Sequence, residues 1–159
     1  MKLIPLTKGY FTKVDDKDFE KFAIYRWHAT IGTQGKIKAR RNNFINGIRS
    51  YIYLHRAIMN VPKGLYTDHI NHDTLDNRKK NLRICTFQQN CFNKIKHKDN
   101  TSGYKGVYWS KKENKWFSAI GFNRKLKNLG YYKTAKESAK VYNKKAKELF
   151  GKFAYLNKI

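Results

Sequence analysis

The chain of 159 residues is long enough for one ordinary domain or two small ones. Its 35 Lys and Arg residues against 11 Asp and Glu residues give a formal net charge of +24, which is typical of a protein that binds a polyanion. Nucleic acid is the first candidate because neutralised phosphates release counterions, whereas no run approaches the roughly 20 apolar residues of a membrane-spanning helix.

The N-terminus and the cysteines indicate a cytoplasmic protein. The opening segment MKLIPLTKGYF has no apolar region of a secretory signal. Cys85 and Cys91 cannot form a four-thiolate zinc site, and no CxxC pair occurs. We therefore expect both thiols to be reduced and to pack in the core beside Leu82 and Phe87.

Short strands and helices are predicted in the first third of the chain. Residues Lys2–Val14 alternate loosely, as in short strands around Gly9, and Asp15 is predicted to cap a helix of about ten residues. Strand-like runs follow at Trp27–Ile31, Lys36–Arg40 and Arg49–Leu54. Asn46-Gly47 predicts a hairpin, and a short helix from His55 to about Asn60 should end before Pro62.

Residues 65–95 predict a compact strand–loop–strand–helix unit. The strand Leu65–Ile70 precedes the polar loop Asn71–Lys80 and a second strand, Leu82–Cys85. Thr86 and Gln89 form a capping box that opens a helix to about Ile95. We expect Asp76 and Asn77 to fix the loop by binding its own backbone amides.

This unit carries polar side chains suited to phosphodiester hydrolysis, which needs a base for water, a cation, and groups that hold both. Asp68 and His69 end the first strand, Asn81 ends the loop and Asn90 lies on the helix. The sequence DHINHDTLDNRKKNLR followed by TFQQN resembles the HNH homing endonucleases of phages and introns. The LHR at Leu54–Arg56 and the segment DDKDFEKF, with the Trp that follows it, share the resemblance, which covers most of residues 1–95.

The resemblance implies a role for each of the four residues. His69 would be the general base, Asp68 and Asn90 would bind a single divalent metal ion, and Asn81 would brace the loop and orient His69. Many members have His where this chain has Asn90. Oxygen ligands without a thiolate favour Mg²⁺ or Mn²⁺ over zinc. We interpret His72 as an exposed loop residue, and His55 as a packing residue or a support for the site.

A polar, basic linker near Lys94–Ser102 predicts domains at residues 1–98 and 99–159. The second domain should contain strands Tyr104–Trp109, Trp116–Phe122 and Leu126–Tyr131. A helix should follow, opened by a Thr134–Glu137 capping box and stopped at Gly151. Its apolar stripe is Ala135, Ala139, Tyr142, Ala146 and Leu149.

Residues from about Thr101 to Asn157 resemble the DNA-binding domain of plant ethylene-response factors, through SGYKGVYW, KWFSAI, LGYYKTAKESAKVYNKKA and LFGKFAYLN. The resemblance implies that one sheet face enters the major groove, while alternation turns Val107, Trp109, Trp116 and Ile120 toward the helix. The expected DNA face carries Lys105, Tyr108, Ser110, Phe117, Arg124, Lys125 and Asn128. Tyr108, Ser110 and Asn128 stand where that family usually has Arg, which weakens guanine readout.

The expected fold class is α+β, with a ββα-metal nuclease domain followed by a three-stranded antiparallel sheet on one helix. The expected function is metal-dependent, site-specific cleavage of double-stranded DNA for a mobile element or phage. Two alternatives stay open, a DNA-binding transcriptional regulator with an inactive HNH unit and an RNA-binding protein. We expect a monomer in the cytoplasm of a bacterial host.

Overall fold

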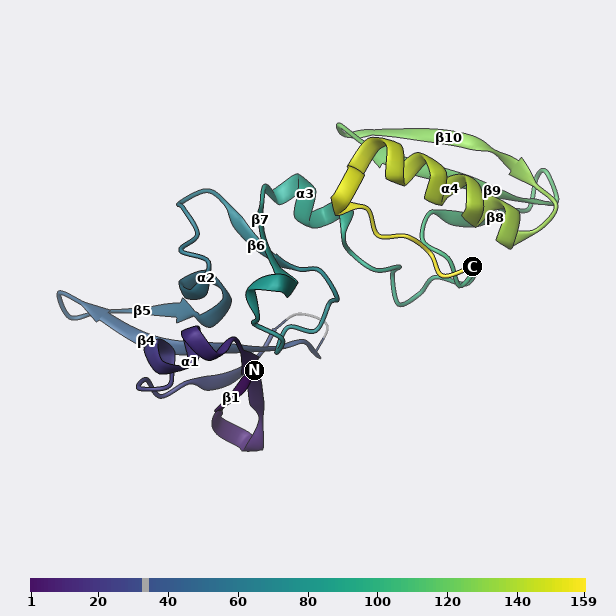
Figure 1. Ribbon diagram of the computed structural model, residues 1–159. Coiled ribbons are helices and arrows are strands. Elements are labelled where there is room, and N and C mark those ends of the chain that lie inside the picture. The colour runs from purple at the N-terminus through teal and green to yellow at the C-terminus, as the bar shows by residue number, and fades with distance from the viewer. Residues whose placement is uncertain (33–34) are drawn as a thin grey trace. The chain divides into compact units, whose positions relative to one another are not determined.

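The computed structural model describes residues 1–32 and 35–159, which divide into two compact units, Met1–Phe87 and Gln88–Ile159 (Figure 1). Within the described residues, both units contain helices together with small sheets, and the strands of every sheet pair antiparallel. The mixed α and β class predicted from the sequence is confirmed.

The first unit begins with an antiparallel pair, β1 (Lys2–Pro5) and β2 (Phe11–Val14), joined through a 3₁₀ turn at Thr7–Gly9. The helix α1 (Asp16–Phe22) follows and has seven residues rather than about ten. The expected side-chain cap is wrong, because the Asp15 carboxylate accepts a hydrogen bond from the Lys79 backbone N–H at 2.7 Å instead. A long-range contact has replaced a local one.

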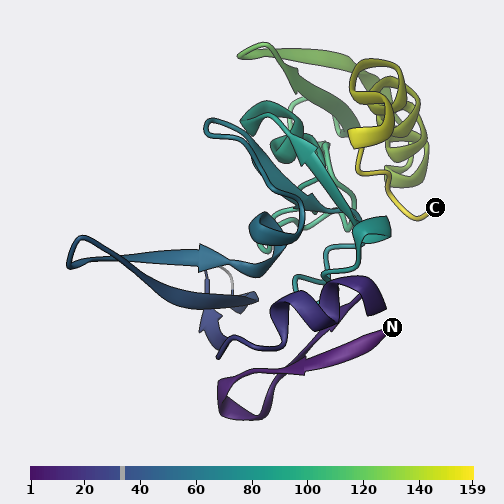
Figure 2. The ribbon, with the colours of Figure 1, turned by 60° about the vertical axis from the view of Figure 1, so that its left-hand side comes forward.

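A three-stranded sheet with the order β3-β4-β5 forms the middle of the unit. Its strands are β3 (His28–Ile31), β4 (Ile37–Ile45) and β5 (Ile48–Tyr53). The predicted strand Lys36–Arg40 is only the first half of β4, which continues to the Asn46-Gly47 turn. Both turn residues have positive φ, 50° and 75°, as a two-residue hairpin turn requires, and the hairpin projects from the rest of the unit (Figure 2).

The core of the first unit gathers side chains from nearly all of its elements. Trp27 is 1% exposed and packs in a cluster with Ile4, Val14, Leu54 and Leu82. Trp27 also donates its indole N–H to the Phe22 carbonyl at the end of α1, at 2.8 Å. Leu54 opens the short helix α2 (Leu54–Ile58), so the core fixes the position of His55 beside it.

The predicted two strands and their helix are present in sequence order. β6 (Tyr66–His69) pairs antiparallel with β7 (Leu82–Cys85), with Asp68 opposite Arg83, and α3 (Phe87–Phe92) follows but ends three residues early. Cys85 is buried and Cys91 is half-buried, and neither forms a disulfide within the described residues. The expected core position of Phe87 is wrong, because its side chain is exposed and contacts the Tyr66 ring.

In the second unit, α4 (Ala135–Phe150) covers one face of a sheet with the order β10-β9-β8 (Figure 1). The strands are β8 (Val107–Ser110), β9 (Lys115–Phe122) and β10 (Lys125–Tyr132). The capping box of Thr134 and Glu137 is confirmed in both of its hydrogen bonds. Gly106 is required before β8, because a Cβ there would lie 2.1 Å from the Tyr142 ring.

Small residues on α4 allow this close packing. Ala139 and Ala146 are fully buried, and Tyr142 and Phe150 pack beside Ile120. Trp109 departs from its expected core position, because 43% of its surface is exposed although its ring contacts Trp116. Among the described residues, no helix is long and apolar enough to cross a membrane.

Candidate active site

Asp68 and His69 end β6, and both side chains are buried, at 6% and 7% exposure. The pairing of β6 with β7 places Arg83 opposite Asp68. The guanidinium binds the Asp68 Oδ2 atom through Nε at 2.8 Å and Nη2 at 2.6 Å. A buried carboxylate is therefore held by a charge-assisted contact from the neighbouring strand.

His69 is oriented by Asn77, a residue of the loop between the two strands. The Nε2 atom of His69 lies 3.1 Å from the Asn77 Oδ1 atom. The Asn77 amide nitrogen donates to Thr12 Oγ1 at 2.7 Å, and the Thr12 hydroxyl donates to the Leu75 carbonyl at 2.8 Å. The amide oxygen can only accept, so Nε2 carries the proton and Nδ1 holds the lone pair of the neutral imidazole.

The surroundings of His69 favour its neutral form. Burial lowers the pKa of His69 below its ordinary value of 6.5, and the positive charge of Lys38 acts in the same direction. The hydrogen bond to Asn77 and the negative charges of Asp68 and Asp73 oppose this effect in part. A neutral imidazole with a lone pair on Nδ1 is the form that can accept a proton from water.

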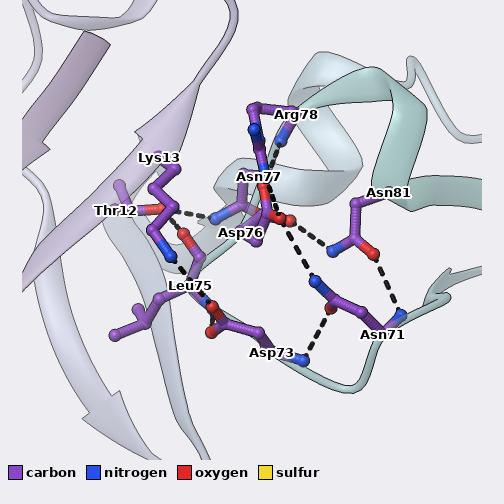
Figure 3. A network of polar contacts seen from close by, with 9 residues as sticks. All are labelled: Thr12, Lys13, Asn71, Asp73, Leu75, Asp76, Asn77, Arg78 and Asn81. Carbon is purple, nitrogen blue, oxygen red and sulfur yellow. Dashed lines mark hydrogen bonds and ion pairs between the residues drawn. The ribbon is translucent and has the colours of Figure 1, made fainter. Parts of the chain in front are cut away.

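Side-chain hydrogen bonds hold the loop between β6 and β7 in place (Figure 3). Asn81 accepts from the Asn71 backbone N–H at 3.0 Å and donates to the Asp76 carbonyl at 2.8 Å. Asp76 is almost fully buried, and its carboxylate accepts hydrogen bonds from Nε and Nη2 of Arg78 at 2.7 Å and 2.6 Å. These contacts lower the pKa of the Asp76 carboxyl. Asn81 thus bridges the two ends of the loop.

The expectation that Asn77 binds backbone amides of the loop is wrong, because its side chain lies between His69 and Thr12. Asp76 matches that expectation only through a long contact from the Arg78 N–H at 3.4 Å. The spacing of the motif gave no signal for the Asn77 contacts, since β2 is more than 60 residues away in sequence.

His55 packs against His69 from α2. The two imidazole rings are 5.2 Å apart, in an edge-to-face arrangement. The ring of Tyr53 also contacts the His55 ring, at 5.6 Å. His55 is 7% exposed, and its Nδ1 atom has no hydrogen-bond partner among the residues that the structure describes. Burial lowers the pKa of His55 to about 3, with a further contribution from His69.

The fourth motif residue, Asn90, belongs to α3 in the second unit, so its place beside Asp68 stays a prediction. Residues 1–32 and 35–159 contain no group of three His, Cys, Asp or Glu side chains arranged around a metal site. Taken one by one, the carboxylate of Asp68 and the amide oxygen of Asn90 are donors of the kind that a hard divalent cation prefers.

The outer face of the C-terminal sheet carries most of the residues expected to meet DNA. Strand pairing places Tyr108 opposite Phe117, and Phe117 opposite Tyr131. The Asn123–Arg124 turn exposes Arg124 and Lys125, and Asn128 is exposed on β10. Ser110 shares the alternation of Tyr108 on β8.

Lys105 lies elsewhere, which corrects its expected position on this face. Its ammonium donates to the backbone carbonyls of Phe92 and Lys94, at 2.7 Å and 2.6 Å. Burial lowers the pKa of Lys105 to about 8. This lysine therefore ties the segment after α3 to the start of the sheet.

A second basic surface was missed in the sequence, on the hairpin of β4 and β5. The guanidinium groups of Arg40 and Arg49 lie over the Tyr51 ring, at 4.1 Å and 5.4 Å from its centre. Arg49 also donates to the Asn42 side chain at 3.1 Å. The available signal was the set of Arg and Tyr residues on either side of Asn46-Gly47, namely Arg40, Arg41, Arg49, Tyr51 and Tyr53.

Comparison with known proteins identifies the same segment. A family model described as HNH endonuclease matches residues 60–91, which include β6, the loop and β7. An uncharacterized HNH endonuclease of Acanthamoeba polyphaga mimivirus is 32% identical over 156 residues, covering 96% of this chain and 77% of the relative. Protein 3.8 of Escherichia phage T7 is 35% identical over 94 residues, covering 59% of this chain and 77% of that protein.

No solved structure matches the chain. The mimivirus relative nevertheless aligns with nearly the whole of it, and the family model covers the strand β6 that carries Asp68 and His69. The chain belongs to the HNH endonuclease family and is a DNA endonuclease.

Proposed function

We propose that this endonuclease hydrolyses phosphodiester bonds of double-stranded DNA with His69 as general base. The observation that carries the proposal is the Thr12–Asn77–His69 chain of hydrogen bonds, which leaves the lone pair on Nδ1. Nδ1 takes the proton of the attacking water, and the burial that lowers the pKa of His69 keeps the base neutral. Asn81 acts indirectly, because its hydrogen bonds fix the loop that carries Asn77.

Asp68 and Asn90 are the residues that would hold one divalent ion, Mg²⁺ or Mn²⁺. When bound, such an ion supplies charge stabilisation for the phosphate and the leaving oxygen. Arg83 already holds the Asp68 carboxylate in a fixed orientation. A preoriented carboxylate loses little conformational freedom when a cation binds.

The second unit is proposed to hold the nuclease on DNA, as a module resembling the ethylene-response-factor domain. Its residues 88–159 include 18 basic and 4 acidic residues, a net charge of +14. The proposed contacts are Tyr108, Ser110, Phe117, Arg124, Lys125 and Asn128. In the first unit, the β4–β5 hairpin adds Arg40 and Arg49 on a two-stranded ribbon, a shape that the major groove admits.

One catalytic centre per chain favours nicking by a monomer. The similarity to a giant-virus protein and a phage protein supports the proposal that the enzyme serves a mobile element or a phage. Cleavage at specific sites is part of the same proposal. For a phage-encoded enzyme, the proposed place of action is the cytoplasm of the bacterial host.

The test is cleavage of a supercoiled plasmid library in the presence of Mg²⁺ or Mn²⁺, with native chain and His69→Ala. Open-circle product from the native chain alone is expected, and DNA binding by His69→Ala should be nearly unchanged. His72→Ala is a matched control, because it removes a loop histidine of the same motif and should still cleave. Cleavage by His69→Ala at the native rate would overturn the assignment of the base.

A further inference from the structure

A row of three aromatic rings crosses the outer face of the C-terminal sheet, one from each strand. The rings of Tyr108 and Phe117 are 5.3 Å apart and nearly parallel, at 29°. Phe117 and Tyr131 are 5.8 Å apart, at 44°. The two tyrosines end the row, and each keeps nearly half of its surface exposed, 48% for Tyr108 and 46% for Tyr131.

The three rings lie on the face of the sheet opposite the one that packs against α4. The core side of β9 contributes Ile120, which packs against α4, while Phe117 belongs to the opposite alternation. Exposed aromatic rings lose apolar contact with the core and gain nothing from water. A row of them on one sheet face indicates a partner with flat, apolar surfaces of its own.

The charge around the row selects a polyanion as this partner. Lys115 shares the face at the end of β9, and Arg124 and Lys125 are exposed at the β9–β10 turn. With a net charge of +14 in this unit, a second copy of the chain would be repelled. Among polyanions, one with unpaired bases offers both phosphates for the lysines and flat rings for stacking.

We propose that the row Tyr108–Phe117–Tyr131 is a stacking platform for unpaired bases, so that the second unit binds single-stranded DNA next to the duplex that is cut. The inference rests on the proposed DNA binding of this unit and names the kind of DNA. Base stacking tolerates any sequence, since every base has a flat face. The platform therefore selects DNA by strand separation, in place of the guanine readout that arginines would give.

The test uses the full chain in EDTA, which prevents cleavage. Fluorescence anisotropy measures binding to a labelled oligothymidylate, to a blunt duplex, and to the same duplex with a single-stranded tail. The affinity of the protein for the tailed duplex and for the oligothymidylate should be higher than its affinity for the blunt duplex. Tyr108→Leu and Tyr131→Leu, which keep an apolar side chain on the sheet, should each weaken oligothymidylate binding about tenfold and should weaken blunt-duplex binding clearly less.

Two controls separate stacking from other effects. Tyr108→Phe keeps the ring and should retain affinity, and Trp109→Leu removes an exposed ring from the opposite alternation of β8 and should bind like native chain. Equal oligothymidylate affinity of the Tyr→Leu variants and native chain would overturn the platform. Equal losses for single strand and blunt duplex would also overturn it. Neither result touches the nuclease assignment, which the His69→Ala plasmid assay tests separately.

Single-stranded RNA also offers unpaired bases. Competition between the labelled oligothymidylate and an unlabelled oligouridylate of the same length distinguishes a DNA ligand from an RNA ligand. Displacement of the DNA by a lower concentration of RNA would overturn the assignment to DNA, and weaker competition by RNA supports it.

Discussion

The His69 Nε2 atom lies 3.1 Å from the Oδ1 atom of Asn77, and both side chains are buried. The contact decides which nitrogen of the imidazole can act as a base, because Thr12 fixes the orientation of the Asn77 amide. A strand at the N-terminus thus sets the tautomer of a histidine more than 50 residues later.

The first prediction concerns Asn77. Asn77→Ala should lower the rate of plasmid cleavage roughly 10- to 100-fold, because the imidazole loses the group that fixes its tautomer. Asn71→Ala is the control, since it removes loop hydrogen bonds without touching His69. Both variants are first compared by thermal unfolding. A rate for Asn77→Ala equal to that of Asn71→Ala would contradict the positioning role.

The second prediction concerns the pH dependence of cleavage. Burial lowers the pKa of His69, so the base stays neutral and active below pH 6.5, its ordinary value. The acidic limb of kcat/KM against pH should therefore have its midpoint below 6.5. Asn77→Asp places a negatively charged carboxylate beside Nε2 of His69 and should move this limb to higher pH. A native midpoint above 6.5 would be inconsistent with the environment of His69.

The third prediction concerns acid stability. The pKa of His55 is about 3 in the folded protein and about 6.5 in the unfolded chain, so protonation favours unfolding. The contribution of this neutral histidine is present above pH 6.5 and is lost as the pH falls toward 3. The difference corresponds to at most about 5 kcal/mol. His55→Leu should therefore show a smaller decrease in unfolding free energy than native chain between these pH values.

Urea unfolding at closely spaced pH values measures this difference, and comparison with His97→Leu, an exposed histidine, provides the control. Identical pH slopes for His55→Leu and native chain would rule out His55 as the titrating group.

The fourth prediction concerns the ion pair of Asp68 and Arg83, whose side chains are 8% and 13% exposed. Arg83→Gln leaves the buried carboxylate without its positive partner and should destabilise the fold by about 3 kcal/mol. A cation can then compensate the carboxylate, so Mn²⁺ should raise the Tm of Arg83→Gln more than that of native chain. Arg78→Gln, which affects Asp76 instead, should show the native response. Equal Tm increases in all three proteins would contradict the prediction, because they would show that the loss of Arg83 does not change cation binding.

Local chemistry in the sequence was enough to predict the order of the elements. Alternation gave the strands, Asn46-Gly47 gave a hairpin turn, and the capping box of Thr134 and Glu137 gave the start of α4. Each of these signals depends on residues a few positions apart. The adjacent Asp68 and His69, at the end of a predicted strand, likewise pointed to the candidate site.

The tertiary structure decided what depends on residues far apart in the chain. It directed Asp15 to Lys79 instead of its own helix, Lys105 to the carbonyls of Phe92 and Lys94, and Asn77 to Thr12 and His69. In each case a polar group has several possible partners of the same chemistry. Only the packing of the chain brings one of them within hydrogen-bond distance, and a buried polar group must take the partner it meets.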